Sequence, residues 1–556
     1  ENYEIEIELI KDECQRFTEV ELIKKIKTGI KYVLCGLQNS NYPISYNEQE
    51  KIQKEYLTTI NGRKMERRIN NGDFVGPSSI SLEMPNIIRY AEKNKIPNIT
   101  EPYTVTEKAD GIRKLLYISN NGKIFMIDMN MNVQFTGCIT PHPNNFNSIL
   151  DGEHVLYNKA GEYINLYLAF DIYQRNKENY MGFPFVEVEG LSYVDKNMAK
   201  DKFRLTELNK FIDQLDANCV VLDYDMPLRI EAKRFYTNLE KDRNIFYQCK
   251  IILDGIEEGM FDYETDGLIF TPCDKSVGSD KIGFINPPKK VTWNYSMKWK
   301  PPEYNTVDFL ISTVKDGGDN DVVGNIFKSG LNVSNGSQIS QYKTVILRVG
   351  YDESKHGFIN PCSDLLEGNF PKYNQFNDRS KYKPMPFIPT RYTPNFPIYE
   401  CRLILDTKGS TKNMITESGE EIIEDNTIVE FRYDASLDKY YQWIPIRVRY
   451  DKTAEFRKGL SNYGNAFHVA DSVWESINNP VTAEMIKSGK NIHHDYTPTF
   501  LRKANGHTKI KQSQFGQDVI ALHLNKNEYF NNFPKESRQY KVSISNIDVS
   551  DPFVEY

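Results

Sequence analysis

The sequence lacks three features that would each have assigned it to a particular class of protein. Its eight cysteines form no CxxC pair and no zinc-ligand spacing, which argues against a disulfide framework or structural zinc and favours a reducing, cytosol-like compartment. No apolar run is long enough for a membrane-spanning helix, so we expect no membrane partner. The net charge of -7 excludes a global basic field, and any nucleic acid would need a local groove.

The sequence does contain enough apolar residues for more than one folded core. Of its 556 residues, 39% are hydrophobic and 26% are charged, and about two to four domains are expected at this length. Between residues 18 and 60 the spacing predicts amphipathic helix, with a capping box formed by Thr18 and Glu21. After Pro302 the composition favours β-structure, and we expect five strands at 306–313, 343–351, 398–406, 426–433 and 440–450.

The most informative segment is the run from Glu107 to Arg113, which follows a β-rich stretch and contains Lys108-Ala109-Asp110-Gly111. A lysine at the end of a strand can act as a nucleophile on phosphorus, but only as the neutral amine, so its pKa must fall from about 10.4. Neighbouring cations or a bound metal would lower it. On its own the segment is more often a surface hairpin, because Asp-Gly marks ordinary turns.

Further charged elements follow Lys108 in a fixed order, each beside an apolar strand-like run. Any one of them alone would indicate a half-buried strand with a polar face, whereas the ordered set favours a shared site. The elements are Leu150-Asp151-Gly152-Glu153, Ala169-Phe170-Asp171, Thr265-Asp266-Gly267, Lys298-Trp299-Lys300 and Arg449-Tyr450-Asp451-Lys452.

This ordered set resembles the covalent nucleotidyltransferase superfamily, which contains mRNA guanylyltransferases and the DNA and RNA ligases. The Lys-Trp-Lys-Pro element, the Asn305–Phe309 run after it and the final Arg-x-Asp-Lys look like the capping branch. The resemblance covers roughly residues 85 to 475, and the two ends of the chain look like the multifunctional capping enzymes of poxviruses, asfarviruses and giant viruses. It implies an α+β fold, with a two-sheet nucleotidyltransferase domain (ATP-grasp-like, ligase-type) followed by an OB-fold lid domain.

The resemblance implies that Lys108 carries GMP from GTP to the 5′-diphosphate end of RNA, which forms a GpppN cap. Catalytic roles would fall to Lys108, Lys298, Lys300, Arg449, Asp451 and Lys452. Nucleotide contacts would come from Glu107, Asp110, Gly111, Arg113, Asp151, Glu153, Phe170 and Asp266. Magnesium or manganese would be held by Glu153 and Asp266, since carboxylates and substrate phosphates suit these ions. Phe170 either stacks on guanine or is a core phenylalanine.

Partners and competing functions follow from the same resemblance. We expect GTP and RNA as substrates, a methyltransferase-stimulating subunit or the transcription apparatus as partners, and a location in the cytoplasm of the infected host cell or in the virion. An ATP-dependent polynucleotide ligase is the first alternative, although the Arg449-x-Asp451-Lys452 element argues against it. A catalytically inactive RNA-binding scaffold is the second, and the intact set of charged residues argues against that.

The first residues predict a strand, because Tyr3 to Ile10 alternate perfectly and place Glu4 and Glu6 on one face. This is either an exposed antiparallel strand or, by the resemblance, an incomplete metal-binding remnant of a tunnel-type RNA triphosphatase, for which we expect no activity. The expected domains are this remnant with a helical connector (1–73), the guanylyltransferase domain (74–302), the OB-fold domain (303–458) and a linker toward a methyltransferase domain (459–556). No G-x-G run for S-adenosylmethionine occurs in the linker.

Overall fold

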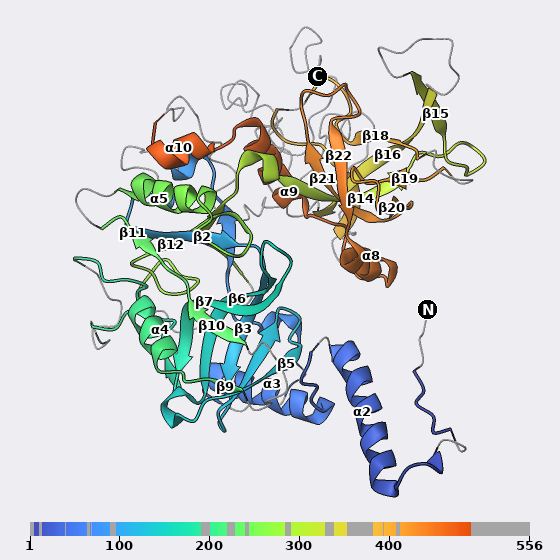
Figure 1. Ribbon diagram of the computed structural model, residues 1–556. Coiled ribbons are helices and arrows are strands. Elements are labelled where there is room, and N and C mark those ends of the chain that lie inside the picture. The colour runs from blue at the N-terminus through green and yellow to red at the C-terminus, as the bar shows by residue number, and fades with distance from the viewer. Residues whose placement is uncertain are drawn as a thin grey trace, which may run out of the picture.

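The chain forms a mixed α/β structure in which several sheets surround separate apolar cores (Figure 1). The computed structural model describes residues 5–10, 14–38, 40–63, 67, 69–88, 96–190, 199, 201–219, 228–239, 244–283, 291–327, 339–352, 382–392, 394–406 and 412–490. None of the helices within these ranges is both long and apolar enough to cross a membrane.

The described helices lie mainly at the two ends of the chain. They are α2 (Glu19–Gln38), α3 (Tyr46–Asn61), α4 (Arg204–Asp213), α5 (Ile245–Glu257), α8 (Tyr450–Arg457), α9 (Phe467–Asn478) and α10 (Ala483–Ser488), with short 3-10 turns η1 (Asn71–Asp73), η2 (Met84–Asn86), η3 (Pro143–Asn145) and η4 (Pro302–Tyr304). The predicted capping box forms at the start of α2, where the Thr18 N–H donates to the Glu21 carboxylate at 2.8 Å and the Glu21 N–H donates to Thr18 Oγ1 at 3.4 Å.

A five-stranded sheet carries the predicted nucleophile. Its order is β1 (Ser78–Ser81), β13 (Thr292–Trp299), β12 (Thr265–Pro272), β2 (Tyr103–Ala109) and β11 (Tyr236–Thr237), with β1 parallel to β13 and the other pairs antiparallel. Apolar residues of β2, β12 and β13 share one core with side chains of α5 and α10, which lie over this sheet in Figure 1. The three strands that bring the site together therefore rest on a continuous apolar layer.

An eight-stranded sheet lies beside it. The order is β10 (Arg229–Ala232), β7 (Tyr163–Arg175), β6 (Ser148–Tyr157), β3 (Ile112–Ile118), β4 (Lys123–Asp128), β5 (Val133–Ile139) and β9 (Asn218–Cys219), with β8 (Glu178–Asn179) paired to β7. Because successive residues of β3 face opposite sides, Leu115 and Tyr117 pack with α3 residues, whereas Leu116 and Ile118 pack with α4 residues. Helix α3, expected in the connector before the catalytic domain, is therefore part of this domain's core.

The third sheet contains all five strands predicted after Pro302. It is built from β14 (Thr306–Thr313), β15 (Val323–Phe327), β16 (Ile339–Asp352), β17 (Tyr382–Pro386), β18 (Glu400–Ile404), β21 (Ile428–Tyr433) and β22 (Trp443–Val448), next to a small ribbon of β19 (Met414–Ile415) and β20 (Ile422–Ile423). Sequence reasoning missed β15 and β17. An aromatic cluster of Phe309, Phe387, Trp443 and Trp474 lies in its core.

The described part of the expected linker, up to residue 490, is folded onto both neighbouring cores. Phe467 and Trp474 of α9 pack in the core of the third sheet, whereas Met485 and Ile486 of α10 pack in the core of the five-stranded sheet. The two helices therefore join the catalytic region to the third sheet, and the structure differs here from an extended connection. Residues 491–556, the rest of that expected domain, lie outside the described residues.

The predicted N-terminal strand does not form in the described residues 5–10, which are irregular. Ile5 and Ile7, expected on the buried face, are 61% and 44% exposed, and Glu6 is also exposed. A strand is stabilised by hydrogen bonds to a neighbour, and no described strand pairs with this segment. Glu4, the other predicted metal ligand of the triphosphatase remnant, lies outside the described residues.

Candidate active site

Lys108 lies near the end of β2 and is held by a carboxylate from the neighbouring strand. Its Nζ donates to Asp266 Oδ1 at 2.5 Å, and Lys300 Nζ lies 2.5 Å from the other oxygen, Asp266 Oδ2. The order β13, β12, β2 explains the grouping, since Asp266 lies on the middle strand and Lys300 directly follows β13. The structure thus brings together three residues that the sequence predicted as one site.

Gly267 permits this close approach of β12 to β13. Its φ of +147° is a conformation that other residues rarely adopt, and an added Cβ would lie 1.9 Å from the Trp299 carbonyl oxygen. The ladder between β12 and β2 also shifts register between Thr265 and Leu268. Trp299 is buried and donates from Nε1 to the Val481 carbonyl at 2.7 Å, so it is a core residue.

Arg113 lies on β3 at the entrance to the second sheet and is fixed by several partners. Its Nε and Nη2 bond the two oxygens of Asp151 at 3.0 and 2.5 Å, and its Nη1 donates to the Pro77 carbonyl at 2.8 Å. The guanidinium also lies 5.7 Å from the ring centroid of half-buried Phe170. Although burial opposes the charged form, Asp151 holds the pKa of Arg113 above its ordinary value.

Asp151 was predicted as a nucleotide contact, but the structure places it behind Arg113. Its side chain is fully buried, and its carboxylate accepts hydrogen bonds from Arg113 and from the Tyr173 hydroxyl. Residues 151 and 153 share one side of β6, and only Glu153 of the two remains half-buried and reachable. Asp151 therefore positions the arginine, and a direct nucleotide contact is left to Glu153.

Glu153 faces the same region as Lys108 and Arg113. It is the register partner of Arg113 across β3 and β6, and an added Cβ on Gly111 would lie 2.8 Å from Glu153 Cγ. Burial raises the pKa of Glu153 to about 7, although Lys233, Lys108 and Arg113 oppose the rise. A carboxyl with this pKa changes charge near neutral pH, and a bound cation would keep it ionised.

Glu107, predicted to contact the nucleotide, points away from Lys108 because neighbouring residues of a strand face opposite sides. It is buried and accepts hydrogen bonds from Thr106 Oγ1 at 2.8 Å and the Tyr263 hydroxyl at 2.9 Å. Its carboxylate lies 3.2 Å from Lys233 Nζ, which donates to the Glu107 carbonyl at 2.6 Å. Sequence reasoning missed Lys233, since an isolated lysine after a short strand has no distinctive spacing.

Asp110 and Gly111 form the exposed passage from β2 into β3, and therefore from one sheet into the other. The Asp110 N–H donates to the Glu264 carbonyl at 2.8 Å, which ties this passage to the segment before Asp266. The Asp-Gly pair is thus a turn, as its composition indicated, but a turn that joins the two sheets of the site rather than a surface hairpin.

Lys298 projects into the cleft without an ion-pair partner among the described residues. Its side chain reaches solvent, yet desolvation in the cleft and repulsion by Lys108 and Lys300 lower its pKa, which Asp266 only partly offsets. Lys108 and Lys300 thus share the Asp266 carboxylate, and Lys298 lies near them as a third cation. The centre has more positive than negative charge and suits a phosphate group.

The final charged element reaches the same region from the third sheet. Arg449 Nη1 and Lys452 Nζ lie 2.7 and 2.5 Å from Asp308 Oδ2, which is on β14. Asp451 is largely exposed, and its carboxylate lies 3.6 Å from Arg449 Nε. The strand predicted to run to Tyr450 ends at Val448, because helix α8 begins at Tyr450. The first turn of α8 carries Asp451 and Lys452.

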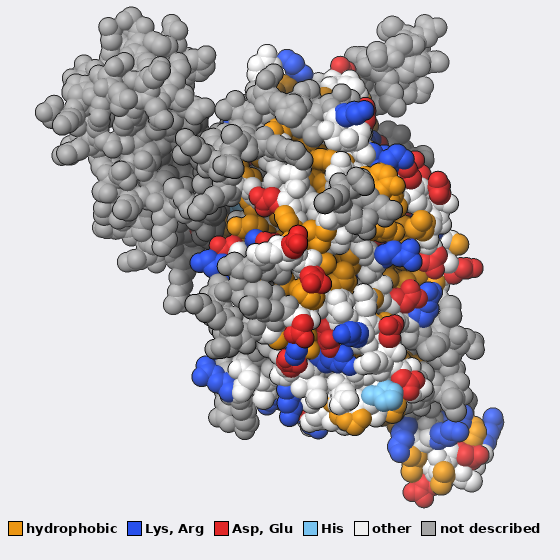
Figure 2. All heavy atoms as spheres, turned by 90° about the vertical axis from the view of Figure 1, so that its left-hand side faces the viewer, with side chains coloured by type: hydrophobic (Ala, Val, Ile, Leu, Met, Phe, Trp, Pro, Cys, Tyr) orange, Lys and Arg blue, Asp and Glu red, His pale blue; other side chains and the backbone are white. Residues whose placement is uncertain are grey.

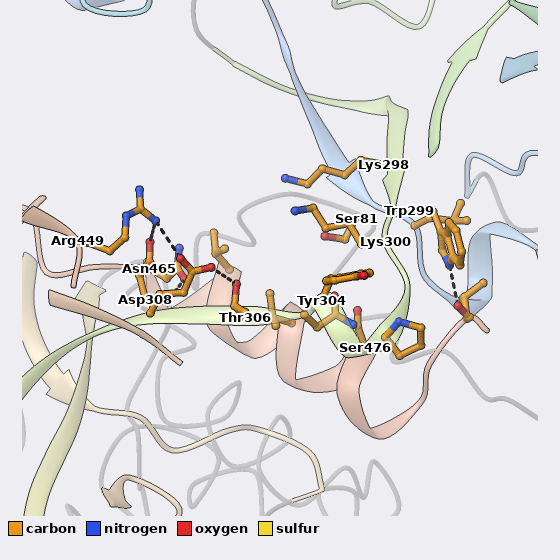
Figure 3. Close-up of a pocket in the computed structure, with 17 residues that line it drawn as sticks. Ser81, Lys298, Trp299, Lys300, Tyr304, Thr306, Asp308, Arg449, Asn465 and Ser476 are labelled. Carbon is orange, nitrogen blue, oxygen red and sulfur yellow. Dashed lines mark hydrogen bonds and ion pairs between the residues drawn. The ribbon is translucent and has the colours of Figure 1, made fainter. Parts of the chain in front are cut away.

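A cavity of about 240 Å³ lies between the five-stranded sheet and the third sheet (Figure 3). Lys298 and Lys300 project toward it from one side and Arg449 from the other, and the Tyr304 ring lies next to Lys300. The cavity is therefore lined from both sheets. The face seen in Figure 2 has acidic and basic side chains interspersed.

The carboxylates present fit a magnesium or manganese ion only if substrate oxygens complete its set of ligands. Within the described ranges no group of three or more His, Cys, Asp or Glu side chains is placed to hold a metal. Asp266, and Glu153 beside Lys108, supply oxygen ligands of the kind that magnesium uses together with substrate phosphates and water. The donor set thus fits an ion that arrives with a nucleotide.

The fold and site define an α/β protein with a lysine-centred, phosphate-handling site, and sequence comparisons identify its family. Residues 41–283 match the family described as mRNA capping enzyme, catalytic domain, and residues 365–487 match mRNA capping enzyme, C-terminal domain. Together these matches cover more than half of the chain, which belongs to the mRNA capping enzyme family.

Relatives from viruses and animals carry the same name. A probable mRNA-capping enzyme of Acanthamoeba polyphaga mimivirus is 27% identical over 534 residues, which is 88% of this chain and 38% of the relative. The mRNA-capping enzyme of an African swine fever virus isolate (Pig/Kenya/KEN-50/1950) is 22% identical, over 70% of this chain and 35% of the relative. The mRNA-capping enzyme of Danio rerio is 26% identical, over 44% and 36%. The chain spans little more than a third of the length of these relatives.

Among solved structures, one similar chain is the mycobacterial DNA ligase D complexed with ATP and MES. The TM-score is 0.29 and the sequence identity 10%, over 67% of this chain and 95% of that chain.

Proposed function

We propose that the chain is an mRNA guanylyltransferase, which transfers GMP from GTP through Lys108 to the 5′-diphosphate end of RNA. The observation that carries this proposal is the Lys108–Asp266–Lys300 group at the junction of two sheets, in a chain of the capping enzyme family. Its charge excess favours a phosphate, and its lysine can form a covalent intermediate.

The chemistry divides into two displacements at the same phosphorus. In the first, neutral Lys108 Nζ bonds to the α-phosphorus of GTP and loses one proton to solvent, and pyrophosphate leaves with the electron pair of the broken P–O bond. In the second, a terminal phosphate oxygen of the RNA bonds to that phosphorus and the P–N bond breaks, which returns the electron pair to Lys108. Lys298 and Lys300 neutralise phosphate charge in both steps, which needs fixed cations rather than proton transfer.

The nucleotide would lie between Arg113, Glu153 and Phe170. Arg113 offers a guanidinium fixed by Asp151, and half-buried Phe170 offers an aromatic face for guanine. Asp266 and Glu153 would hold magnesium or manganese, and this ion supplies neutralisation of phosphate charge when it is bound with the nucleotide.

We further propose that the third sheet is an OB-type lid domain (303–458) on a catalytic domain (74–302). Support comes from Arg449, which lines the same cavity as Lys298 and Lys300. Closing a lid over the nucleotide would exclude water from the phosphorus during the first displacement, and reopening would admit RNA. The viral relatives suggest action in the cytoplasm of an infected cell or in the virion.

Incubation with α-labelled GTP or ATP and magnesium tests the proposal. We expect acid-labile label on the protein from GTP, none from Lys108→Ala, and unchanged labelling of Lys159→Ala, whose lysine is exposed on the connection between β6 and β7. Circular dichroism and unfolding measurements check that Lys108→Ala remains folded. Label from ATP alone would favour a polynucleotide ligase, and no label from either nucleotide would favour an RNA-binding scaffold.

A further inference from the structure

Tyr304 is an exposed aromatic residue on the wall of the cavity between the two regions. It ends η4, the short turn between β13 and β14, and is 57% exposed. Within the described residues its side chain makes no hydrogen bond, ring contact or ion pair. A tyrosine usually buries its ring and bonds its hydroxyl, so a ring left open beside lysines offers a stacking surface to a ligand.

The cations around Tyr304 are arranged for phosphate. Lys298 has no carboxylate partner among the described residues, and Lys300 shares Asp266 with Lys108, so a phosphate at Lys300 would lie next to the nucleophile. In Figure 3 the Tyr304 ring lies close to Lys300, on the side away from Lys298.

The acidic residues that line the cavity are already neutralised. Asp308 pairs with Arg449 and Lys452, and Glu430 lies 2.5 Å from Arg447 Nε. Their charges therefore oppose an anionic ligand little. The neutral polar residues that complete the lining are Ser81, Asn305, Thr306, Asn465 and Ser476.

We propose that this cavity receives the 5′-terminal nucleotide of the acceptor RNA, with its first base stacked on Tyr304 and its phosphates at Lys298 and Lys300. The proposal rests on the proposed guanylyltransferase function, because it concerns the second displacement only. After pyrophosphate has left, the terminal phosphate oxygen of the bound RNA attacks the α-phosphorus of the Lys108-bound GMP, and the released amine of Lys108 takes up a proton. Tyr304 is a binding residue and takes no part in the bond changes.

The test separates the two displacements. Wild type, Tyr304→Ala and Tyr304→Phe are labelled with GTP and then given a 5′-diphosphate oligoribonucleotide, with Tyr157→Ala as a control because Tyr157 is also 57% exposed and lies outside the cavity lining. We expect equal labelling in all four proteins. The KM for RNA should rise about 5- to 150-fold in Tyr304→Ala, the range for loss of one stacked base, and stay near wild type in Tyr304→Phe.

An acceptor whose first nucleotide lacks its base provides a second comparison. In the wild type, loss of the base should raise the KM for RNA by a factor similar to that of Tyr304→Ala with intact RNA. In Tyr304→Ala, loss of the base should raise the KM little further, because the base and the ring form one contact and removal of either partner abolishes it.

Three results would overturn the proposal. An unchanged KM for RNA in Tyr304→Ala would show that the first base does not stack on Tyr304 and would overturn the proposed placement of the RNA. Equal damage to GTP labelling and to transfer would assign the cavity to the first nucleotide instead. Absence of label from the wild type would overturn the guanylyltransferase function and this proposal with it.

Discussion

Replacement of Asp151 by asparagine should destabilise the catalytic region, because it removes the carboxylate that forms an ion pair with Arg113. Asp151 is fully buried, and its two oxygens accept hydrogen bonds from Arg113 and the Tyr173 hydroxyl. Asparagine has nearly the same shape, so the change removes one charge and one acceptor oxygen without leaving a cavity.

The size of the effect follows from the surroundings of Arg113. Breaking a buried ion pair by removal of one partner costs about 3–5 kcal/mol. Arg113 keeps its bond to the Pro77 carbonyl, and 21% of its side chain reaches solvent, which reduces the penalty for the unpaired charge. We therefore expect a loss of about 2–4 kcal/mol in the free energy of unfolding.

Hydrogen exchange of the strands that carry this pair gives the local free energy of opening, which is needed because a chain with several cores does not unfold in two states. The control is Glu231→Gln, which breaks the exposed ion pair with Arg229 and should cost less than about 1 kcal/mol. Protection of β3 and β6 within about 0.5 kcal/mol of wild type in Asp151→Asn would refute the assignment of Asp151 as the support of Arg113.

Further predictions concern the pH response and the packing of the site. Calorimetry should show that magnesium and an α,β-methylene GTP analogue bind more tightly as pH rises through about 7, because the carboxyl of Glu153 ionises there. The affinity of Glu153→Gln should change less with pH, and identical pH profiles would contradict a role of Glu153 in binding the ion. Burial lowers the pKa of His154 to about 4 in the folded protein, whereas in the unfolded chain His154 takes up a proton near pH 6.5. The free energy of unfolding should therefore fall by up to roughly 3 kcal/mol as pH falls from about 6.5 to 4. Urea unfolding at several pH values should show that the stability of His154→Gln depends less on pH in this range. An unchanged dependence of stability on pH would contradict the contribution of His154. Gly267→Ala should abolish GTP labelling and lower the melting temperature, because the added Cβ meets the Trp299 carbonyl; normal labelling would show that the strands can separate without cost.

The strands after Pro302 could be predicted from the sequence because their signals are local. The β-rich composition of 306–313 depends on a few neighbouring residues, and β14 spans this range as expected. The meeting of Lys108, Asp266 and Lys300 followed from the resemblance to a family. Composition and spacing alone could not have shown that β2, β12 and β13 are neighbours.

The errors at the site arose where side-chain direction or distant packing decides. Glu107 and Asp151 were predicted to contact the nucleotide, yet each is buried as the partner of a cation, Lys233 and Arg113 respectively. Such a pairing depends on which strands adjoin, and one strand's sequence does not contain that information. For the same reason the expected linker gave no sign that α9 packs in the core of the third sheet.

The short connection between β13 and β14 links the two walls of the cavity. Lys300 precedes Pro301 and Pro302, and Tyr304 follows them. Asp308, which pairs with Arg449, lies on the next strand, β14. Helices α9 and α10 form a second connection, since their side chains pack in the cores of the third and the five-stranded sheet respectively. Opening of the proposed lid would therefore have to move Arg449 against both connections, while Lys298 and Lys300 stay with the five-stranded sheet. Such a motion would change the distance between the two cationic walls, and Tyr304, next to the proline-restricted connection, would stay close to Lys300.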